Sequence, residues 1–415
     1  MDLDIEFVRS WFPAFAEPSL EGWSFFENAG GSYACRPTID ALDRFYRSTK
    51  VQPYAPYPAS TEAGEAMDRS RRRWAEALGV ATDEVAFGPS TSMNTYVLAA
   101  ALRPSLGSGD RVIVTNQDHE ANTGALRRMV ADTGAELVEW RIDPATGLLD
   151  IEVLATLITD NTRVVAMPHC SNIVGQENDV AAVAALVHET GARLIVDGVS
   201  FAPHTLPNVA ALDADVYLFS LYKTYSVHQG LMVARNGLLD DVANQGHFFN
   251  ADSPAKRLTP AGPDHAQEAA AGAVLDYVEA LHLHHDGAES DGLSAAAASV
   301  SSLWRDHESS LLPEVLDLLA RTDGVRLLGP DEVGGAELHR CPTVAFVPLG
   351  QSPDEVVDRL IERGIMCSAG HFYAYRVLQG MDVDPERGVV RLSWVHYTSN
   401  EDVAKLVTAL AEVLG

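Results

Sequence analysis

The sequence predicts an α/β protein in which a mostly parallel sheet forms a large domain and a smaller α+β unit follows. Two observations lead to this prediction. Seven short runs of β-branched and apolar residues lie between positions 84 and 234, and helix-like stretches separate several of them. The runs are almost wholly apolar, as expected of strands that are covered on both faces. A chain of 415 residues is also long enough to bury a sizeable core.

The expected elements of the large domain follow one another in a regular order. The runs expected to be strands are 84–88, 111–115, 136–140, 163–167, 193–196, 216–220 and 231–234. The helix-like stretches that follow the first, second and fourth runs are 93–102, 122–133 and 180–190. Active sites of parallel sheets form at the carboxyl ends of the strands. Functional residues are therefore expected just after each run.

The C-terminal part of the chain has a different pattern. A long helical pattern covers 266–283, and the Gly-, Ser- and Ala-rich stretch 286–302 fits either a linker or a poorly capped helix at 297–303. The later segments that suggest a smaller α+β unit are 314–320, 343–348, 354–363, 389–394 and 400–414. We therefore expect a large domain at 26–285 and a small domain at 286–415, which the N-terminal segment 1–25 joins.

The charge of the chain excludes several kinds of partner. It has 30 Lys and Arg against 58 Asp and Glu, a formal net charge of −28. This excess of acid would repel nucleic-acid phosphates and anionic membrane surfaces, so neither is expected as a partner. The N-terminus is acidic where a signal peptide is basic, and no apolar run approaches the ~20 residues that span a bilayer.

Cysteine and histidine positions indicate neither a disulfide framework nor a metal site. The four cysteines stand far apart, at Cys35, Cys170, Cys341 and Cys367. This spacing favours a reducing compartment, and we expect a cytoplasmic protein. His282, His284 and His285 resemble a metal-binding tract, but they lie at the end of a helical pattern. Histidine there interacts favourably with the helix dipole, so we expect no metal.

Polar residues follow several of the predicted strands. Ser90, Thr91 and Ser92 lead from the first run into a helix, where such residues either bind an anion such as phosphate or only cap the helix. His119 follows the second run, and Asn172 follows the fourth. Each of these signals is weak by itself.

Two ionisable residues close the later strands. Asp197 ends the fifth run, and Lys223 follows the sixth. Burying a carboxylate is costly unless a protonated ring nitrogen or a metal pairs with it. Burial also lowers the pKa of a lysine toward that of a nucleophilic amine.

One ligand accounts for the whole pattern. Pyridoxal phosphate needs a phosphate cradle, an aromatic group stacked on its ring, a partner for its phenolic oxygen, a carboxylate for its pyridinium nitrogen and a lysine. The strand ends supply a candidate for each. We therefore predict an enzyme that uses pyridoxal 5'-phosphate on a small amino-acid substrate. A dinucleotide-binding dehydrogenase is disfavoured because no GxGxxG motif follows the first strand.

Motifs spread over nearly the whole chain match one enzyme family. They are Phe26-Glu27-Asn28-Ala29-Gly30-Gly31, Asp118-His119-Glu120-Ala121-Asn122, Ser171-Asn172-Ile173-Val174-Gly175, Asp197-Gly198-Val199-Ser200, Ser220-Leu221-Tyr222-Lys223, and Arg391-Leu392-Ser393 followed by His396-Tyr397-Thr398-Ser399-Asn400-Glu401. This set resembles the class V aminotransferase and cysteine desulfurase group. The resemblance implies the fold of a fold-type-I pyridoxal-phosphate-dependent transferase.

The resemblance also implies roles for the matching residues. Lys223 would bind the cofactor covalently and later move the Cα proton. Asp197 would hold the pyridine nitrogen protonated, and His119 would stack on the ring. The residues that would bind the phosphate are Thr91, Ser92 and Ser220, and those that would address the phenolic oxygen are Asn172 and Ser200.

The substrate is expected on the other side of the cofactor. Arg391 would hold the substrate carboxylate, in the bidentate geometry that arginine favours. Asn28 lies in a segment that is near the substrate in relatives. His371 and Tyr373 belong to a loop that would face the substrate, where they either assist the leaving group or simply pack.

Three positions depart from the family pattern. Ser200 stands where relatives have Gln or His, and Tyr222 stands where desulfurases have a His before the lysine. Desulfurases also carry a nucleophilic Cys in the loop before the C-terminal Arg motif, and aligning the Gly-His pair of that loop places Tyr373 at the cysteine position. Cys367 lies six residues earlier, and we interpret it as a small core residue. We therefore predict no ordinary desulfurase turnover.

The reaction that we expect is C–S β-elimination on an S-substituted cysteine. Other members of the group are transaminases, enzymes that couple decarboxylation to deamination of cysteine conjugates, and cysteine desulfurases, and each stays open as an alternative. A non-catalytic cofactor-binding relative also stays open. The joint presence of Lys223, Asp197 and Arg391 argues against it, because a scaffold needs none of them.

The resemblance further implies a homodimer with a shared active site. In relatives the partner chain supplies a phosphate contact from the stretch before the long helix, which corresponds here to 259–263. Gly262 stands where many relatives have Thr, so that hydroxyl is missing. The segment 54–60 is also expected to border the site.

Overall fold

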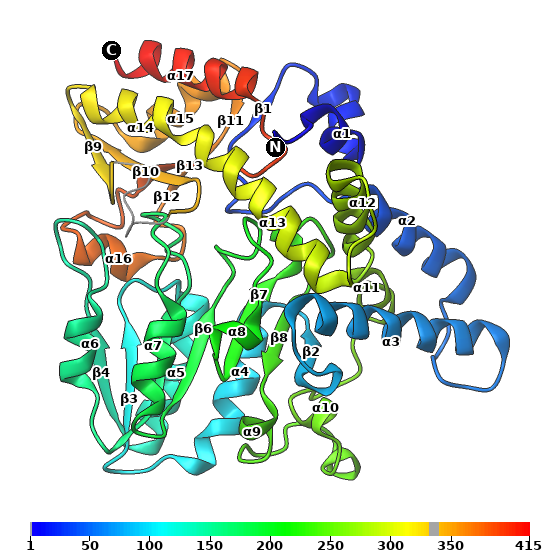
Figure 1. The fold of residues 1–415 in the computed structure, drawn as a ribbon. Helices are drawn as coiled ribbons and strands as arrows, with labels where there is room; N and C mark the ends of the chain where they lie inside the picture. The colour runs from blue at the N-terminus through cyan, green and yellow to red at the C-terminus, as the bar shows by residue number, and fades with distance from the viewer. Residues whose placement is uncertain (1, 332–339) are drawn as a thin grey trace.

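The computed structural model describes residues 2–331 and 340–415 (Figure 1). Its largest sheet has seven strands in the order β2-β8-β7-β6-β5-β3-β4. These strands are β2 (Val85–Gly88), β3 (Arg111–Thr115), β4 (Glu136–Trp140), β5 (Thr162–Pro168), β6 (Arg193–Asp197), β7 (Val216–Ser220) and β8 (Gly230–Ala234). Among the seven, β8 alone runs against the rest, since both of its pairings are antiparallel. The predicted α/β class with a mostly parallel sheet is confirmed.

Two hydrophobic cores lie on opposite faces of this sheet. Residues of β5 alternate between them: Val165 and Met167 pack in one core, and Val164 and Ala166 pack in the other. Because alternate strand residues face opposite sides, a strand that is buried on both faces must be apolar throughout. The helices that lie between the strands in the chain are α4 (Thr91–Leu102), α5 (Glu120–Thr133), α6 (Ile151–Leu157), α7 (Val180–His188) and α8 (Val209–Leu212).

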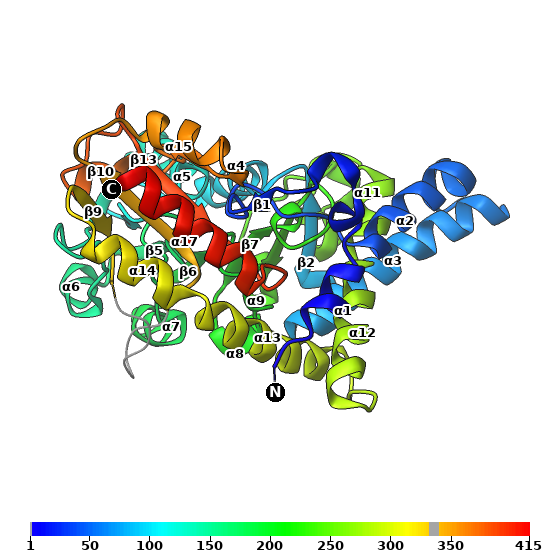
Figure 2. The same ribbon diagram turned by 90° about the horizontal axis from the view of Figure 1, so that it is seen from above.

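Further helices cover the sheet or extend beside it. They are α1 (Ile5–Ser10), α2 (Arg36–Arg44), α3 (Pro58–Leu78), α9 (Asn236–Leu239), α10 (Pro254–Arg257), α11 (His265–Ala271) and α12 (Val274–Asp286). The single helix expected over 266–283 is thus divided into α11 and α12, beside Gly272. A Cβ at Gly272 would lie 2.8 Å from Ser70 Cα, so close packing on α3 requires the glycine. In Figures 1 and 2, α2 and α3 project away from the body of the molecule.

The stretch 286–302 is not a linker, and the helix there is longer than 297–303. From Leu293 on it belongs to α13 (Leu293–Ser310), an 18-residue helix that runs diagonally between the two parts of the molecule (Figure 1). Leu293, Ala297, Val300 and Trp304 recur at helical spacing and are buried. Burial of this stripe stabilises the helix, which the run of four alanines at its start also favours.

A second sheet lies in the C-terminal part of the chain. Its order is β12-β13-β10-β9, and its pairings are antiparallel. The elements of this part are α14 (Leu312–Arg321), β9 (Val325–Leu328), β10 (Thr343–Pro348), α15 (Pro353–Ile361), β11 (Ile365–Met366), β12 (Ser368–Gly370), α16 (Tyr375–Gly380), β13 (Val389–Ser393) and α17 (Asn400–Leu414). Figure 2 shows α14, α15 and α17 beside this sheet. The N-terminal strand β1 (Ser24–Phe25) pairs with β11, whereas Val8 and Phe12 pack into a core of the large sheet.

Short 3₁₀ or π turns connect several of these elements. They are η1 (Pro13–Ala16), η2 (Pro18–Leu20), η3 (Phe45–Thr49), η4 (Thr82–Glu84), η5 (Arg103–Ser105), η6 (Leu221–Lys223) and η7 (Phe248–Asn250). Within the described ranges, no helix is both long and apolar enough to cross a membrane.

The histidine cluster ties the N-terminus to α12. His284 Nε2 lies 3.0 Å from Asp4 Oδ2, and its ring stacks on Phe7 at 3.8 Å. His285 Nε2 accepts a 3.0 Å hydrogen bond from the backbone N–H of Asp4. The cluster is therefore used in packing.

Candidate active site

A cavity of about 610 Å³ lies at the carboxyl ends of the parallel strands. The predicted site residues that line it are Thr91, Ser92, His119, Asn172, Asp197, Ser200, Ser220, Lys223, Tyr373 and Arg391. They come from the seven-stranded and four-stranded sheets and the segments next to them. The structure thus brings together residues that are up to 300 positions apart in the chain.

Lys223 stands in η6, directly after β7, and is 9% exposed. Burial, together with the nearby charge of Arg391, lowers the pKa of its amine to about 8. The carboxylates of Asp197 and Glu27 act in the opposite direction. An amine with this pKa is partly uncharged near neutral pH, so it can act as a nucleophile or accept a proton.

Asp197 is the last residue of β6 and is also buried. Its Oδ1 accepts a hydrogen bond of 2.9 Å from the backbone N–H of Val199. Burial raises the pKa of the carboxyl to about 6. A cationic partner in the cavity would stabilise its ionised form.

Asp118 is a second buried carboxyl, which the sequence motif contained but which we assigned no role. Its side chain bonds Thr115 and accepts a 2.6 Å hydrogen bond from Asn122. Burial raises its pKa to about 7, and the charge of Asp197 acts in the same direction. These bonds fix the turn that presents the next residue, His119, to the cavity.

His119 precedes α5 and caps it. Its Nδ1 accepts a hydrogen bond of 3.0 Å from the N–H of Ala121, so in the neutral ring the proton resides on Nε2. Burial, Lys223 and Arg391 lower its pKa to about 3, so the ring is neutral at physiological pH. Its centroid lies 5.3 Å from that of Tyr373.

The N-terminus of α4 and the end of β7 form an anion cradle. Thr91 Oγ1 and Ser220 Oγ lie 2.7 Å apart, and Ser90 caps the helix by accepting from the N–H of Met93. A Cβ at Gly230 of β8 would lie 2.5 Å from the backbone N of Thr91. The glycine therefore lets β8 approach this helix end, where free N–H groups attract anions.

Arg391 lies in the middle of β13 and is 3% exposed. Its Nη2 forms an ion pair of 3.0 Å with Glu27 Oε1, and its Nη1 donates to the carbonyl oxygen of Asn172 at 3.3 Å. The ring of Phe372 covers its guanidinium at 3.8 Å. Glu27 also lines the cavity, although its sequence motif predicts no role for it.

Two predicted substrate residues, Asn28 and His371, are not among those that line the cavity. The amide of Asn28 is directed elsewhere, because its Nδ2 donates to the carbonyl of Ser393 and its Oδ1 accepts from the Tyr397 hydroxyl. His371 Nδ1 accepts a 3.1 Å hydrogen bond from the N–H of Tyr373. Both residues shape neighbouring backbone instead of facing the cavity.

The chain also matches a known family over most of its length. Residues 24–406 match the family described as aminotransferase class-V. This chain is a class V aminotransferase family member. Enzymes of this family depend on pyridoxal phosphate.

Similar proteins carry related names. The aminotransferase-like protein FGM3 of Gibberella zeae is 34% identical, covering 99% of this chain and 98% of its own length. A cysteine desulfurase of Cronobacter sakazakii is 27% identical over 100% of this chain and 99% of its own. The apo structure of a cysteine desulfurase from Thermococcus onnurineus NA1 superposes with a TM-score of 0.85 at 22% identity, covering 100% of this chain and 98% of that one. The last likeness shows the fold.

The residues of this class V family member fit pyridoxal phosphate. Asn172 Oδ1 is buried and has no hydrogen-bond partner in the described part of the chain, so it can accept a hydrogen bond from a phenolic oxygen that carries its proton. The same cavity holds a buried lysine, a buried carboxyl and the hydroxyl pair at the anion cradle. These are the groups that a phenolic oxygen, an aldehyde, a ring nitrogen and a phosphate require.

Tyr222 has a neighbour that sequence comparison missed. The ring of His228 stacks on Tyr222 at 4.7 Å and 9°, and both line the cavity. An imidazole is therefore present beside the position where desulfurases carry their histidine. It comes from five residues after Lys223, in the turn before β8, where no motif marked it.

The loop 370–374 is tied to the large domain. Asn172 Nδ2 donates to the carbonyl oxygen of Phe372 at 3.0 Å, and the N–H of Glu120 donates to that of Tyr373 at 2.8 Å. Phe372 and Tyr373 have φ of 49° and 56°, in the left-handed region that side chains other than glycine rarely adopt. These bonds hold the loop over the cavity.

Cys367 is separate from this loop. It lies between β11 and β12, is 8% exposed and packs in the core of the small sheet. Burial, together with the charge of Glu27, raises its pKa to about 12. Cys170 does line the cavity, with its Sγ 3.3 Å from the carbonyl oxygen of Gly175.

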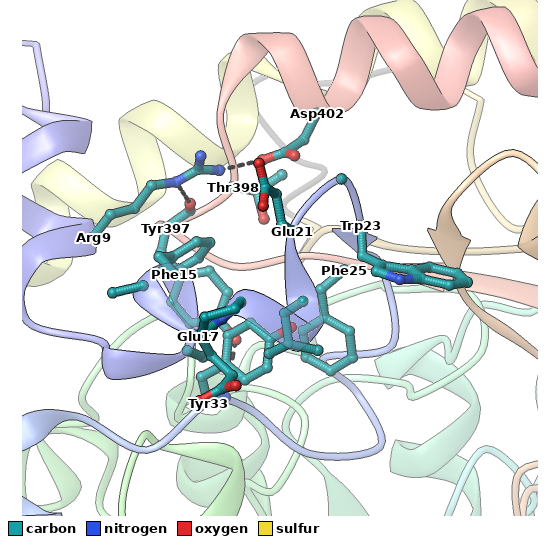
Figure 3. A pocket seen from close by; sticks show the side chains of 15 residues that line it. Arg9, Phe15, Glu17, Glu21, Trp23, Phe25, Tyr33, Tyr397, Thr398 and Asp402 are labelled. Atoms are coloured by element: carbon teal, nitrogen blue, oxygen red, sulfur yellow. Dashed lines mark hydrogen bonds and ion pairs between the residues drawn. The ribbon is translucent and has the colours of Figure 1, made fainter.

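A second cavity, of about 450 Å³, lies between the N-terminal segment and α17 (Figure 3). Aromatic rings of Phe15, Phe25 and Tyr33 surround it, and Arg9 at its edge bonds Asp402 and the carbonyl oxygen of Tyr397. It contains none of the predicted site residues.

Proposed function

We propose that the chain is a C–S β-lyase that acts on an S-substituted cysteine and releases a thiol, pyruvate and ammonium. The observation that supports this proposal is Tyr373, which lines the cavity from the loop 370–374 and which the sequence resemblance aligns with the cysteine of desulfurases. Cys367, the thiol nearest to this loop in the sequence, is buried in a core. Cys170 does line the cavity, but its Sγ is directed to the carbonyl oxygen of Gly175. A desulfurase needs a thiolate that can reach the substrate sulfur, whereas β-elimination needs a proton acceptor, a carboxylate clamp and a good leaving group.

The residues around the cavity divide the tasks. Pyridoxal phosphate, when bound, supplies an electron sink that stabilises negative charge at the substrate Cα. We assign its ring nitrogen to Asp197, its phenolic oxygen to Asn172 and Ser200, and its ring face to His119. Its phosphate is assigned to Thr91, Ser92 and Ser220.

Proton transfer is assigned to Lys223. Its Nζ would hold the cofactor and, as a free amine, would accept the proton from the substrate Cα, which its lowered pKa favours. Arg391 orients the substrate through its carboxylate. Phe372 and Tyr373 line the cavity from the loop 370–374, and we assign to them the role of limiting the access of water to the reacting carbon.

Product analysis tests this assignment. Purified enzyme with S-ethyl-L-cysteine is expected to release ethanethiol and pyruvate in equal amounts, and Lys223→Ala is expected to abolish both. Alanine and sulfide formed from free cysteine would instead identify a desulfurase. A keto acid that retains its sulfur and needs a keto-acid acceptor would identify an aminotransferase, the alternative that the name of the Gibberella zeae relative favours.

We also propose that the active form is a homodimer in the cytoplasm. Exposed aromatic side chains on η3, before α3 and on α4 support an interface: Tyr46, Tyr54, Tyr57 and Tyr96. The stretch 259–263 does not line the cavity of its own chain. In the proposed dimer, the stretch 259–263 of one chain would contact the phosphate in the cavity of the other chain. The four cysteines are all free thiols, which agrees with a reducing compartment. A monomer that turns over at full rate in light scattering would contradict the dimer.

A further inference from the structure

The ion pair between Glu27 and Arg391 leaves two buried atoms unused. Arg391 Nε and Glu27 Oε2 have no hydrogen-bond partner among the described residues. Both residues line the cavity. Buried polar atoms without partners are costly, so an unpaired donor and an unpaired acceptor on two residues that line the same cavity indicate a ligand that satisfies both.

The two atoms, Arg391 Nε and Glu27 Oε2, require opposite partners: the first needs an acceptor and the second needs a donor. Arg391 Nε can donate to a carboxylate oxygen, and the other guanidinium nitrogens keep spare N–H groups beside their bonds to Glu27 and Asn172. Glu27 Oε2 can only accept. A substrate carboxylate on Arg391 also brings a second negative charge close to Glu27, which a cation on the same substrate would offset.

Backbone geometry keeps Glu27 in this place. A Cβ at Gly30 would lie 2.7 Å from Glu27 Oε1, so the carboxylate occupies room that another residue at position 30 would fill. Glu27 also acts on the reacting centre, since its charge raises the pKa of Lys223. The carboxylate is thus near the lysine and fixed beside the arginine.

We propose that Glu27 is a specificity-determining residue that selects substrates whose sulfur substituent carries an ammonium or another N–H cation. This inference rests on the proposed function, which uses Arg391 as the carboxylate clamp. The preferred substrate class is therefore an S-(aminoalkyl)cysteine. Its carboxylate binds Arg391 and its distal cation binds Glu27 Oε2.

A matched pair of compounds tests the selection. S-(2-aminoethyl)-L-cysteine and S-propyl-L-cysteine have side chains of equal length and differ by an ammonium against a methyl group. We expect the wild-type kcat/KM to favour the aminoethyl compound by about tenfold or more, as for a hydrogen bond to a charged group. Glu27→Gln should bring the ratio to within about twofold of unity, because the amide keeps an oxygen but loses the charge.

Two further variants separate charge from packing. Glu268→Gln makes the same change in another buried pair, Arg71–Glu268, which does not line this cavity, and should keep the wild-type ratio. Gly30→Ala displaces the Glu27 carboxylate without removing its charge, and should lower the ratio even if Glu27→Gln does not fold. An unchanged ratio in the Glu27→Gln or Gly30→Ala enzyme, with both compounds slowed equally, would show that Glu27 only positions Arg391 and would overturn the inference.

The same proteins distinguish this failure from failure of the proposed function. If neither compound releases thiol, the β-lyase assignment is wrong. In that case the dissociation constant of each compound is measured from the shift of the cofactor's visible band, and the ratio of the two constants replaces the ratio of kcat/KM values. A wild-type ratio near unity in that titration overturns the selection by Glu27, whichever reaction the enzyme catalyses.

Discussion

The chain buries two arginine–glutamate pairs that resemble each other closely. Arg391–Glu27 spans β13 and the segment after β1, with one contact of 3.0 Å, and Arg71–Glu268 joins α3 and α11, with one contact of 2.5 Å. In each pair the arginine Nε and the glutamate Oε2 lack a partner among the described residues. The pairs differ in their surroundings, since the first lines the 610 Å³ cavity and the second does not.

This difference shows what a deficit of hydrogen bonds can and cannot indicate. The unpaired atoms of Arg71 and Glu268 lie in an interface between helices, where no ligand can bind, and this pair holds α3 against α11. The same deficit in a cavity, next to Lys223 and Asp197, has room for a ligand. Location in the cavity, and not the deficit itself, makes Glu27 and Arg391 candidates for recognition.

The largest expected difference concerns catalysis. Arg391→Leu should lower kcat/KM by about 100-fold or more, because loss of one partner of a buried charged contact costs roughly 2–5 kcal/mol. Arg71→Leu should leave kcat/KM of the folded enzyme nearly unchanged. Steady-state kinetics of both variants check this, and equal losses of activity would remove the distinction between the pairs.

The second difference concerns stability, and here the larger loss is expected at the Arg71–Glu268 pair. Glu268→Gln leaves an arginine unpaired in a closed interface, and should lower the free energy of unfolding by about 3–5 kcal/mol. Glu27→Gln should cost less, because Arg391, although only 3% exposed, keeps its hydrogen bond to the carbonyl oxygen of Asn172 and its contact with the Phe372 ring. Denaturant titration of the cofactor-free proteins measures both, and a larger loss in Glu27→Gln would contradict the comparison.

A third difference appears in the pH dependence of cofactor loading. With a pKa of about 8 for Lys223, the rate at which cofactor-free enzyme gains its visible band should rise up to pH 8 and then level off, since the uncharged amine reacts. Glu27→Gln should move this midpoint to lower pH, because the carboxylate raises the lysine pKa. Arg391→Leu should move it to higher pH. Glu268→Gln, as the control, should leave it in place.

The smallest effect is expected at Cys367. The charge of Glu27 raises the pKa of this thiol, but Cys367 does not line the cavity. Cys367→Ser should change kcat/KM by less than about twofold and lower stability by about 1–3 kcal/mol, the cost of an ill-satisfied buried hydroxyl. A persulfide trapped on Cys367 together with complete loss of activity in the variant would reverse the assignment of the reaction.

Much of the cofactor side of the site could be predicted from the sequence. Asp197 and Lys223 end strands that are apolar throughout, and parallel strands bring their ends to one edge. The anion cradle follows the same logic. Local pattern suffices here because each residue is positioned by the strand or helix to which it belongs.

The substrate side could not be predicted in the same way. Asn28 lies in a family motif, but Tyr397, 369 positions later, turns its amide away from the cavity. His228 reaches the cavity by stacking on Tyr222, and Glu27 by pairing with Arg391 across two elements. The division of the helix over 266–283 depends on Ser70, and α13 depends on an apolar partner that the composition of 286–302 does not reveal.

The left-handed backbone at Phe372 and Tyr373 bears on how this enzyme could be re-engineered. Holding two bulky residues in that region costs about 1–3 kcal/mol each, and the hydrogen bonds to Asn172 and Glu120 offset part of it. A single codon change to cysteine at position 373 would replace the side chain but keep this backbone and its anchors. Converting the enzyme into a sulfur-transfer catalyst therefore requires transplanting the loop together with both anchors, as one unit of sequence.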